Sequence, residues 1–312
     1  MSRITQRLSI GIALVIIAPN LTDATEAAKR SDGARTLAVQ LSGSLQNPAW
    51  SPGGNRILFT RFIRGYNRGP ADLITFDVRS RKFRKFLANG ASNVNLPGAA
   101  WSRRAGKIVF SSDVAGADQV FEIADTGSQK SLRQLTSDPR RSSTEPSLSP
   151  DGRRIVFEAG RLGRRRGSIV IADLAGSPNQ RVITARKKDC RQPNWSPAGK
   201  HVLYQCKGRG GWKLWLHNIA TGRAKILSKW QGEMTDGSFS PDGRRVVFSG
   251  ETRSIDKANL FVVSISGGRP KRLTMSDNYD GAPSWSPNGK WIAFESSPRP
   301  GRSTKIMLIA AP

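Results

Sequence analysis

The stretch Pro283–Phe294 reads PSWSPNGKWIAF, and versions of it recur along the whole chain. Each copy begins at a Trp, Leu or Phe anchor, and the anchors lie 44 to 51 residues apart: Trp50, Trp101, Leu148, Trp195, Phe239 and Trp285. Ser follows every anchor, and an aromatic residue stands nine positions after it. Six copies at this period are typical of the blades of a β-propeller.

The repeat predicts a β-hairpin. In the copy Ser149-Pro150-Asp151-Gly152, Pro fixes the first turn position, Asp suits the second, and Gly accepts the positive φ that follows. After this turn, Arg154–Phe157 is a short β-branched and aromatic run. Each repeat therefore begins with two strands, a and b, joined by a tight turn.

Two further runs complete most repeats. The expected c strands are Leu73–Val78, Gln119–Ile123, Ser168–Asp173, Leu214–Ile219, Leu260–Ile265 and Lys305–Ile309. The expected d strands are Phe83–Leu87, Leu132–Thr136, Arg181–Thr184, Ala224–Leu227 and Lys271–Thr274. The sixth repeat lacks strand d, whereas Arg35–Leu41 precedes the first anchor. We expect an all-β, six-bladed β-propeller over residues 35–312, its last blade closed by the N-terminal strand so that no free edge remains.

The N-terminus resembles a secretory signal peptide over residues 1–27. Arg3 and Arg7 precede the apolar run Leu8–Ala18, which is too short for the ~20 residues of a membrane-spanning helix. The alternatives are a buried strand or a retained N-terminal anchor. This reading predicts a periplasmic or secreted protein without a membrane span.

The chain is strongly basic. It has 50 Lys and Arg against 23 Asp and Glu, a formal charge of +27. This balance favours anionic surfaces and polymers, and the candidate contacts are Arg164, Arg165, Arg166, Lys187 and Lys188. The alternative is a solvated basic surface with no dedicated site. Because no nucleic-acid-binding module is visible, we expect no nucleic-acid partner.

The motif Pro-x-Trp-Ser-Pro-x-Gly-x-x-Ile-x-Phe resembles the repeats of the TolB-like β-propeller family. The resemblance covers about residues 35–312 and differs from the WD and kelch repeat signatures. It implies a six-bladed, non-enzymatic periplasmic propeller that receives a protein or ligand at its channel; in the Tol system that partner is the peptidoglycan-associated lipoprotein. An α/β domain precedes the propeller in TolB itself, and we expect none here.

Polar residues just before the anchors are candidates for a partner-binding or ligand-binding ring at one channel mouth: Asn47, Glu145, Gln192, Asp236 and Asp280. Three carboxylates from different blades would bind a cation such as calcium or accept hydrogen bonds from a partner. The alternative is that these residues cap strands and orient water in the channel.

Catalytic groups are hard to find. No G-x-S-x-G elbow occurs, and the only two histidines, His201 and His217, belong to one repeat. We therefore assign no catalytic residue and expect no cofactor. The favoured function is a monomeric binding scaffold for an envelope protein or an anionic glycan. The alternative is a metal-dependent propeller lyase or lactonase that holds its metal through Glu145, Asp236 and Asp280.

The only two cysteines, Cys190 and Cys206, flank the hairpin turn of the fourth repeat. If Ser196 faces Lys200 across a three-residue turn, the cysteines stand opposite each other on strands a and b. Their Cα atoms would then lie near the ~5.5 Å that suits a disulfide. An exported protein with an even cysteine count favours this bridge over two free thiols.

Overall fold

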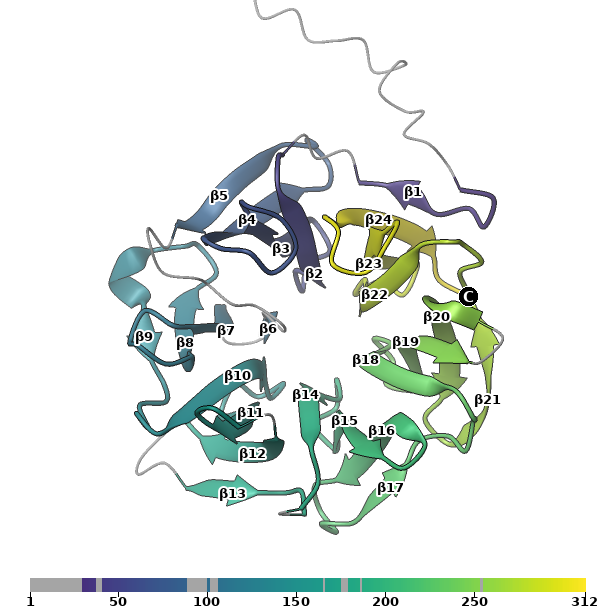
Figure 1. Cartoon of the computed structure of the whole chain (residues 1–312). Helices are drawn as coiled ribbons and strands as arrows, with labels where there is room; N and C mark the ends of the chain where they lie inside the picture. Colours follow the sequence, from purple (N-terminus) through teal and green to yellow (C-terminus); the bar gives the residue numbers. More distant parts are fainter. Residues whose placement is uncertain are drawn as a thin grey trace, which may run out of the picture.

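The computed structural model describes residues 30–37, 41–88, 100–101, 106–164, 166–174, 179–185, 187–252 and 255–312. Six four-stranded antiparallel sheets stand around a central axis (Figure 1). The predicted six-bladed, all-β propeller is therefore confirmed. The expected signal peptide, residues 1–27, lies outside the described residues.

Strand a is innermost and strand d outermost in each blade. The first three blades are β2 (Ser44–Trp50), β3 (Arg56–Phe62), β4 (Ala71–Asp77), β5 (Phe83–Ala88); β6 (Ala100–Trp101), β7 (Lys107–Ser112), β8 (Gln119–Ala124), β9 (Arg133–Gln134); and β10 (Arg141–Leu148), β11 (Arg154–Arg161), β12 (Gly167–Asp173), β13 (Gln180–Val182). The last three are β14 (Cys190–Trp195), β15 (His201–Gly208), β16 (Gly211–Asn218), β17 (Ala224–Ile226); β18 (Glu233–Phe239), β19 (Arg245–Thr252), β20 (Ile255–Ser264), β21 (Gly267–Arg272); and β22 (Tyr279–Trp285), β23 (Trp291–Ser297), β24 (Lys305–Ala310), β1 (Arg35–Thr36). A short 3-10 helix, η1 (Gln129–Ser131), precedes β9.

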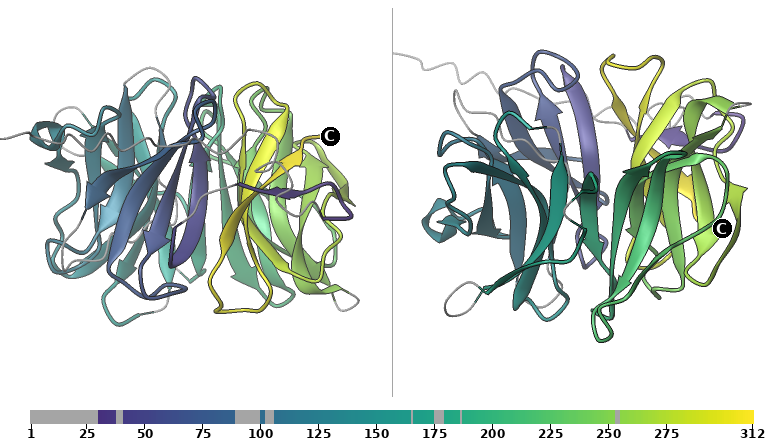
Figure 2. Two further views of the ribbon diagram at one scale, coloured as in Figure 1. Left: turned by 90° about the horizontal axis from the view of Figure 1, so that it is seen from above. Right: turned by 60° about the horizontal axis from the view of Figure 1, so that its bottom comes forward.

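The connections gather on two opposite faces of the disc (Figure 2). We call the face that carries the a–b and c–d turns the turn face. The opposite face carries the b–c and d–a connections, and we call it the loop face. Because every blade has the same strand order, equivalent connections of all blades lie on the same face.

The repeated aromatic on strand b forms the core between blades. The six residues of this set are at most 2 % exposed: Phe59, Phe110, Phe157, Tyr204, Phe248 and Phe294. One apolar cluster joins Val109 and Val120 of the second blade to Leu148 and Phe157 of the third. Both surfaces of each sheet are covered by neighbouring blades, which explains the continuous apolar runs.

Basic residues at the start of strand b add a second contact between blades. The guanidinium of Arg56 lies 4.9 Å from the ring centroid of Trp101 in the next blade. Arg154 stacks in the same way on Trp195, and Arg245 on Trp285. Cation–π contacts of this kind contribute about 0.5–1 kcal/mol at exposed sites. These three tryptophan anchors therefore accept a cation from the preceding blade.

The N-terminal strand closes the ring as predicted. Arg35 and Thr36 pair with Leu308 and Met307 of β24, and the N–H of Leu37 donates to the carbonyl of Ile306 at 2.7 Å. The strand is shorter than the expected Arg35–Leu41, and residues 38–40 lie outside the described part. Strand β1 thus supplies the outer strand that the sixth repeat lacks.

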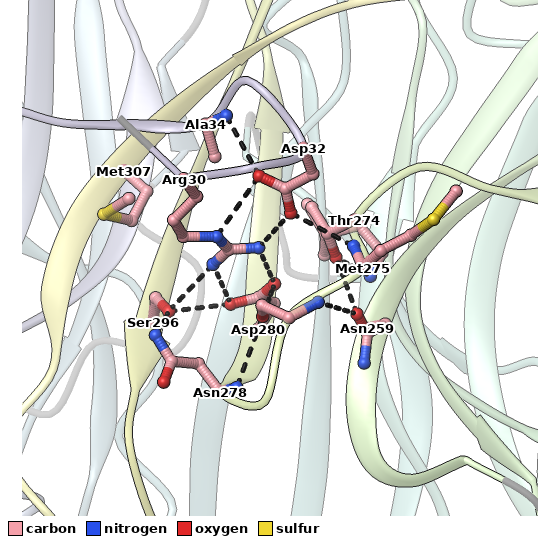
Figure 3. Close-up of polar contacts among 12 residues, drawn as sticks. Arg30, Asp32, Ala34, Asn259, Thr274, Met275, Asn278, Asp280, Ser296 and Met307 are labelled. Carbon is pink, nitrogen blue, oxygen red and sulfur yellow. Dashed lines mark hydrogen bonds and ion pairs between the residues drawn. The ribbon is translucent and has the colours of Figure 1, made fainter. Parts of the chain in front are cut away.

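Arg30, just before β1, forms a buried ion pair with Asp280 at the start of β22 (Figure 3). Its Nη1 and Nη2 donate to Oδ1 and Oδ2 of Asp280 at 2.9 and 2.8 Å. The carboxylate is fully buried and also accepts from Ser296 at 2.7 Å. Asp32 pairs with the same guanidinium and accepts the N–H of Met275 at 3.0 Å. This group, the Arg30 clasp, ties the N-terminal segment to the last blade and to the connection that enters it.

We expect Arg30→Ala to lower the free energy of unfolding by about 3–5 kcal/mol, because Asp280 would remain buried without its counter-charge. Urea unfolding followed by circular dichroism measures this loss. Arg35→Ala is the matched control, since it removes a nearby cation that stacks on Trp291 at 4.5 Å but pairs with no buried acid. An equal loss in both variants would contradict the role of the ion pair.

Cys190 and Cys206 form the predicted disulfide. They are direct partners of strands β14 and β15, and their Cα atoms lie 4.1 Å apart. This separation is shorter than the expected ~5.5 Å because the adjacent pair, Asp189 and Lys207, makes the hydrogen bond, leaving the cysteines at the narrow site of the ladder.

The turn itself differs from the prediction. The N–H of Ser196 donates to the carbonyl of His201, not to Lys200, so the turn is one residue longer. A β-bulge between Arg191 and Asn194 then shifts the register back by one. The two departures cancel at the cysteines, which is why the predicted pairing is correct.

Thiol titration of the denatured, unreduced protein should find no free cysteine.

For a loop of this size, about 15 residues, the chain-entropy estimate is about 3 kcal/mol of stabilisation. Cys190→Ala/Cys206→Ala should therefore unfold at lower urea concentration by a corresponding amount. A double variant as stable as the unreduced parent would show that the bridge does not stabilise this blade.

A candidate binding cavity along the propeller axis

A β-bulge interrupts strand a at the third residue before the anchor. The bulge residues share a left-handed backbone, with φ between 45° and 53°: Asn47, Glu145, Gln192, Asp236 and Ala282. In all five blades the a–b register shifts at this point. A positive φ is uncommon for residues other than Gly, so its repetition marks a constraint on the backbone that the fold imposes in blade after blade.

The bulge directs a backbone N–H toward the preceding blade. The N–H of Asp236 donates to Oε1 of Gln205 at 2.9 Å, and the N–H of Asn47 donates to Oε2 of Glu295 at 3.1 Å. Both acceptors lie on strand b of the blade before. A buried amide needs such a partner, so the bulge residue and the strand-b residue form a linked pair around the axis.

Four carboxyl groups belong to this ring. Glu145 and Asp236 are bulge residues, while Glu158 and Glu295 lie on strand b directly after the repeated aromatic. Sequence reasoning missed the latter two because it considered only strand a. The signal was present in the repeat: the residue after the aromatic is polar in every copy, namely Thr60, Ser111, Glu158, Gln205, Ser249 and Glu295.

The ring carboxyls hold their protons more tightly than usual. Burial raises the pKa of Glu295 to about 8, although the N–H of Asn47 opposes this. Burial also raises the pKa of Asp236. Glu145 and Glu158 share a hydrogen bond, and burial, together with the charge of Glu158, raises the pKa of Glu145 well above its usual value. At neutral pH the ring therefore carries fewer than four negative charges.

A cavity of about 290 Å³ runs along the axis from this ring to the turn face. Its inner end is formed by Asn47, Glu145, Gln192, Asp236 and Ala282. Its outer walls are aromatic and proline side chains: Trp50, Trp101, Trp195, Trp285, Pro52, Pro150, Pro197, Pro241 and Pro287. The cavity thus has a polar inner end and a largely apolar outer wall.

The structure brings together Asn47, Glu145, Gln192 and Asp236, but at the inner end of the cavity instead of at a mouth. The prediction was wrong for Asp280, which lies in the Arg30 clasp. It stands two residues before the bulge of its repeat, where Ala282 takes the ring position. Within the described ranges, no group of three or more His, Cys, Asp or Glu is arranged to hold a metal ion.

The candidate anionic-partner contacts lie on the loop face, away from the outer end of the cavity. Arg164 and Arg166 are exposed in the β11–β12 loop, and Lys187 and Lys188 belong to the β13–β14 connection. The Nζ of Lys188 lies 3.6 Å from the ring centroid of Trp215. Arg165 lies outside the described residues. The cavity and the basic loops therefore form two separate surfaces.

Comparison with known proteins supports the repeat assignment. The family model of the TolB beta propeller domain matches residues 158–307. The Tol-Pal system protein TolB of Francisella tularensis subsp. mediasiatica (strain FSC147) is 29% identical over 108 residues, 35% of this chain and 25% of that protein. A structure of putative TolB from Agrobacterium tumefaciens, 21% identical, has a TM-score of 0.58 and covers 72% of this chain and 76% of its own. Nearly half of the chain, residues 158–307, is thus similar to the TolB beta propeller domain.

The propeller fold is also shared with proteins of other function. An oligogalacturonate lyase in complex with manganese, 13% identical, has a TM-score of 0.61 over 91% of this chain and 95% of its own. The matched segment spans about a quarter of the length of the curated TolB relatives. In the part of the chain that the structure describes, no helix is long and apolar enough to cross a membrane.

The ring carboxyls predict a pH dependence of stability. A carboxyl whose pKa is raised from 4.5 to about 8 on folding, as for Glu295, keeps its proton in the folded state while the unfolded state loses it. Stability should therefore fall as pH rises from about 4.5 to 8.

Glu295→Gln should reduce this fall and stabilise the protein most at the upper end of the window, since Gln cannot ionise yet still accepts from Asn47. Urea midpoints measured between pH 5 and pH 8.5 check this. Asp173→Asn, at an exposed strand end, is the control. A pH profile unchanged by Glu295→Gln would contradict the assignment.

Proposed function

We propose that this TolB-type propeller is an exported, non-enzymatic binding scaffold that receives a segment of an envelope protein in its axial cavity. The observation that carries the proposal is the pair of unsatisfied acceptors at the inner end. Oε2 of Glu145 and Oε1 of Gln192 are buried and lack a hydrogen-bond partner among the described residues, as do the indole N–H groups of Trp50, Trp101 and Trp195 in the outer wall. Buried polar atoms without partners are rare in native proteins. A bound donor would satisfy the two oxygens, and an acceptor on the same segment would satisfy an indole N–H group.

The size and the walls of the cavity support a protein segment. At about 290 Å³ it lies at the lower end of the ~300–1,000 Å³ usual for ligand pockets. One or two inserted side chains fill such a volume. The Trp and Pro side chains of the outer wall supply the aromatic, apolar contacts that dominate protein interfaces.

The polarity of the inner end favours a protein donor over an anionic glycan. The ring presents carboxyl and amide oxygens, and a carboxylate of a glycan would meet them without a counter-charge. A Lys, Arg or hydroxyl side chain would instead donate to the unsatisfied oxygens. Retention of an anionic glycan alone would therefore contradict the proposal.

Export is supported by the disulfide, because such bridges persist in oxidising compartments outside the cytoplasm. The curated relatives are named as Tol-Pal system proteins, which agrees with a place in the cell envelope. A metal-dependent lyase is not favoured by any specific feature of the site. Asp280, one of its three proposed ligands, is paired with Arg30.

Affinity capture from an envelope extract should retain one protein that binds with a defined stoichiometry. Asp236→Asn should weaken the purified complex at least tenfold, because Asp236 lies at the inner end of the cavity, while Asp173→Asn should leave the Kd unchanged. Isothermal titration measures both. If Asp236→Asn binds the same protein as tightly as the parent, or if only an anionic glycan is retained, the proposal fails.

A further inference from the structure

Four of the eight exposed large apolar side chains in the described part lie in connections of the loop face, and these four include the most exposed ones. The other four lie in or next to the outer strands of the blades. Among the described residues, the three with the highest exposure are Met275 at 66%, Val114 at 54% and Leu162 at 51%. All three lie in b–c or d–a connections. Ile63, at 40%, occupies the b–c loop of the first blade, so three successive blades present an aliphatic residue where strand b ends.

Arginines surround these aliphatic tips. Arg64 and Arg68 share the loop of Ile63, and Arg161 and Arg164 flank Leu162. The loop of Leu162 also contacts the preceding d–a connection, where its N–H donates to the carbonyl of Arg140 at 3.2 Å. Across the described ranges no ion pair is formed by this set of exposed side chains: Arg64, Arg68, Arg140, Arg161, Arg164 and Arg166.

Acidic groups on this part of the face are fewer. Asp113 and Asp118 belong to the loop of Val114, and Asp138 accepts the N–H of Arg140 at 2.9 Å. They compensate only part of the positive charge. The first three blades therefore combine exposed aliphatic tips with unpaired arginines on a single surface.

We propose that the loop face of blades one to three docks on the surface of an anionic phospholipid bilayer. Arginines bind the lipid phosphates, and Ile63, Val114 and Leu162 enter the boundary between headgroups and acyl chains. A bilayer uses both features, whereas a soluble polyanion uses the charge and leaves three aliphatic side chains in water. The axial cavity reaches the opposite, turn face, so a docked propeller keeps its cavity free for a partner.

Hydrogen–deuterium exchange of the full chain tests this docking. Vesicles of phosphatidylglycerol and phosphatidylcholine should protect the loops at residues 63–70, 113–118 and 162–166, and vesicles of phosphatidylcholine alone should not. This readout is specific to position. It separates docking of the loop face from any contact made by the apolar run at residues 8–18.

Variants separate the contribution of the arginines to vesicle binding from that of the aliphatic side chains. Each cation near an anionic surface is worth about 1 kcal/mol, or roughly a fivefold change in affinity. Arg64→Gln/Arg161→Gln/Arg164→Gln should thus weaken vesicle binding roughly 100-fold and abolish protection of the loops. Arg79→Gln/Arg81→Gln/Lys82→Gln removes the same charge from the turn face and is the matched control. High salt screens the arginines, so any protection of the loops that remains in high salt comes from the aliphatic side chains. Val114→Ser/Leu162→Ser should lose this remaining protection.

Three results would overturn the proposal. The first is equal weakening by the loop-face and turn-face triple variants, which would show only a net-charge effect. The second is the same loop protection with soluble polygalacturonate as with anionic vesicles, which would assign the face to a glycan. The third is absence of protection in folded protein, verified by its intact disulfide and urea midpoint, which would exclude docking altogether.

Discussion

The β-bulge of strand a is the constraint on which the ring depends. In the five blades where strand a is described over this region, the bulge interrupts the a–b pairing, and in blades one and five the N–H of the bulge residue donates to a strand-b side chain of the preceding blade. Neighbouring sheets are thereby linked by directional hydrogen bonds as well as by apolar packing. The same geometry brings the bulge residues to the inner end of the axial cavity, so the cavity follows from how the blades are joined.

The fold was largely predictable because the repeat encodes it several times. An aromatic residue stands at the same position in all six copies, so each copy indicates independently that this position is buried. One irregular copy does not alter the inference. The disulfide was predictable for a related reason: pairing in a hairpin depends only on register, and the longer turn and the bulge shift that register in opposite directions. Local pattern and local geometry were sufficient for both.

The site was only partly predictable, since it depends on which strand faces which. Reading strand a alone found Glu145 and Asp236 but not Glu158 and Glu295, which come to the axis across the a–b pairing. Asp280 was misplaced because the ring position belongs to the bulge residue, which is Ala282 in this blade. Asp280 lies in the regular part of β22, opposite Ser296, and binds Arg30. No sequence pattern indicated that Arg30, 250 residues away, would be its partner.

The closure of the ring orders events in time as well as in space. Strand β1 and Arg30 are synthesised before β24 and Asp280, the groups with which they pair, and 250 residues separate Arg30 from Asp280. The earliest strand must therefore wait, unpaired, until the last blade exists, and contacts across such separations are slow to form. The buried carboxylate of Asp280 obtains its counter-charge only when these two segments meet. Closure of the ring therefore requires that the last blade has already formed.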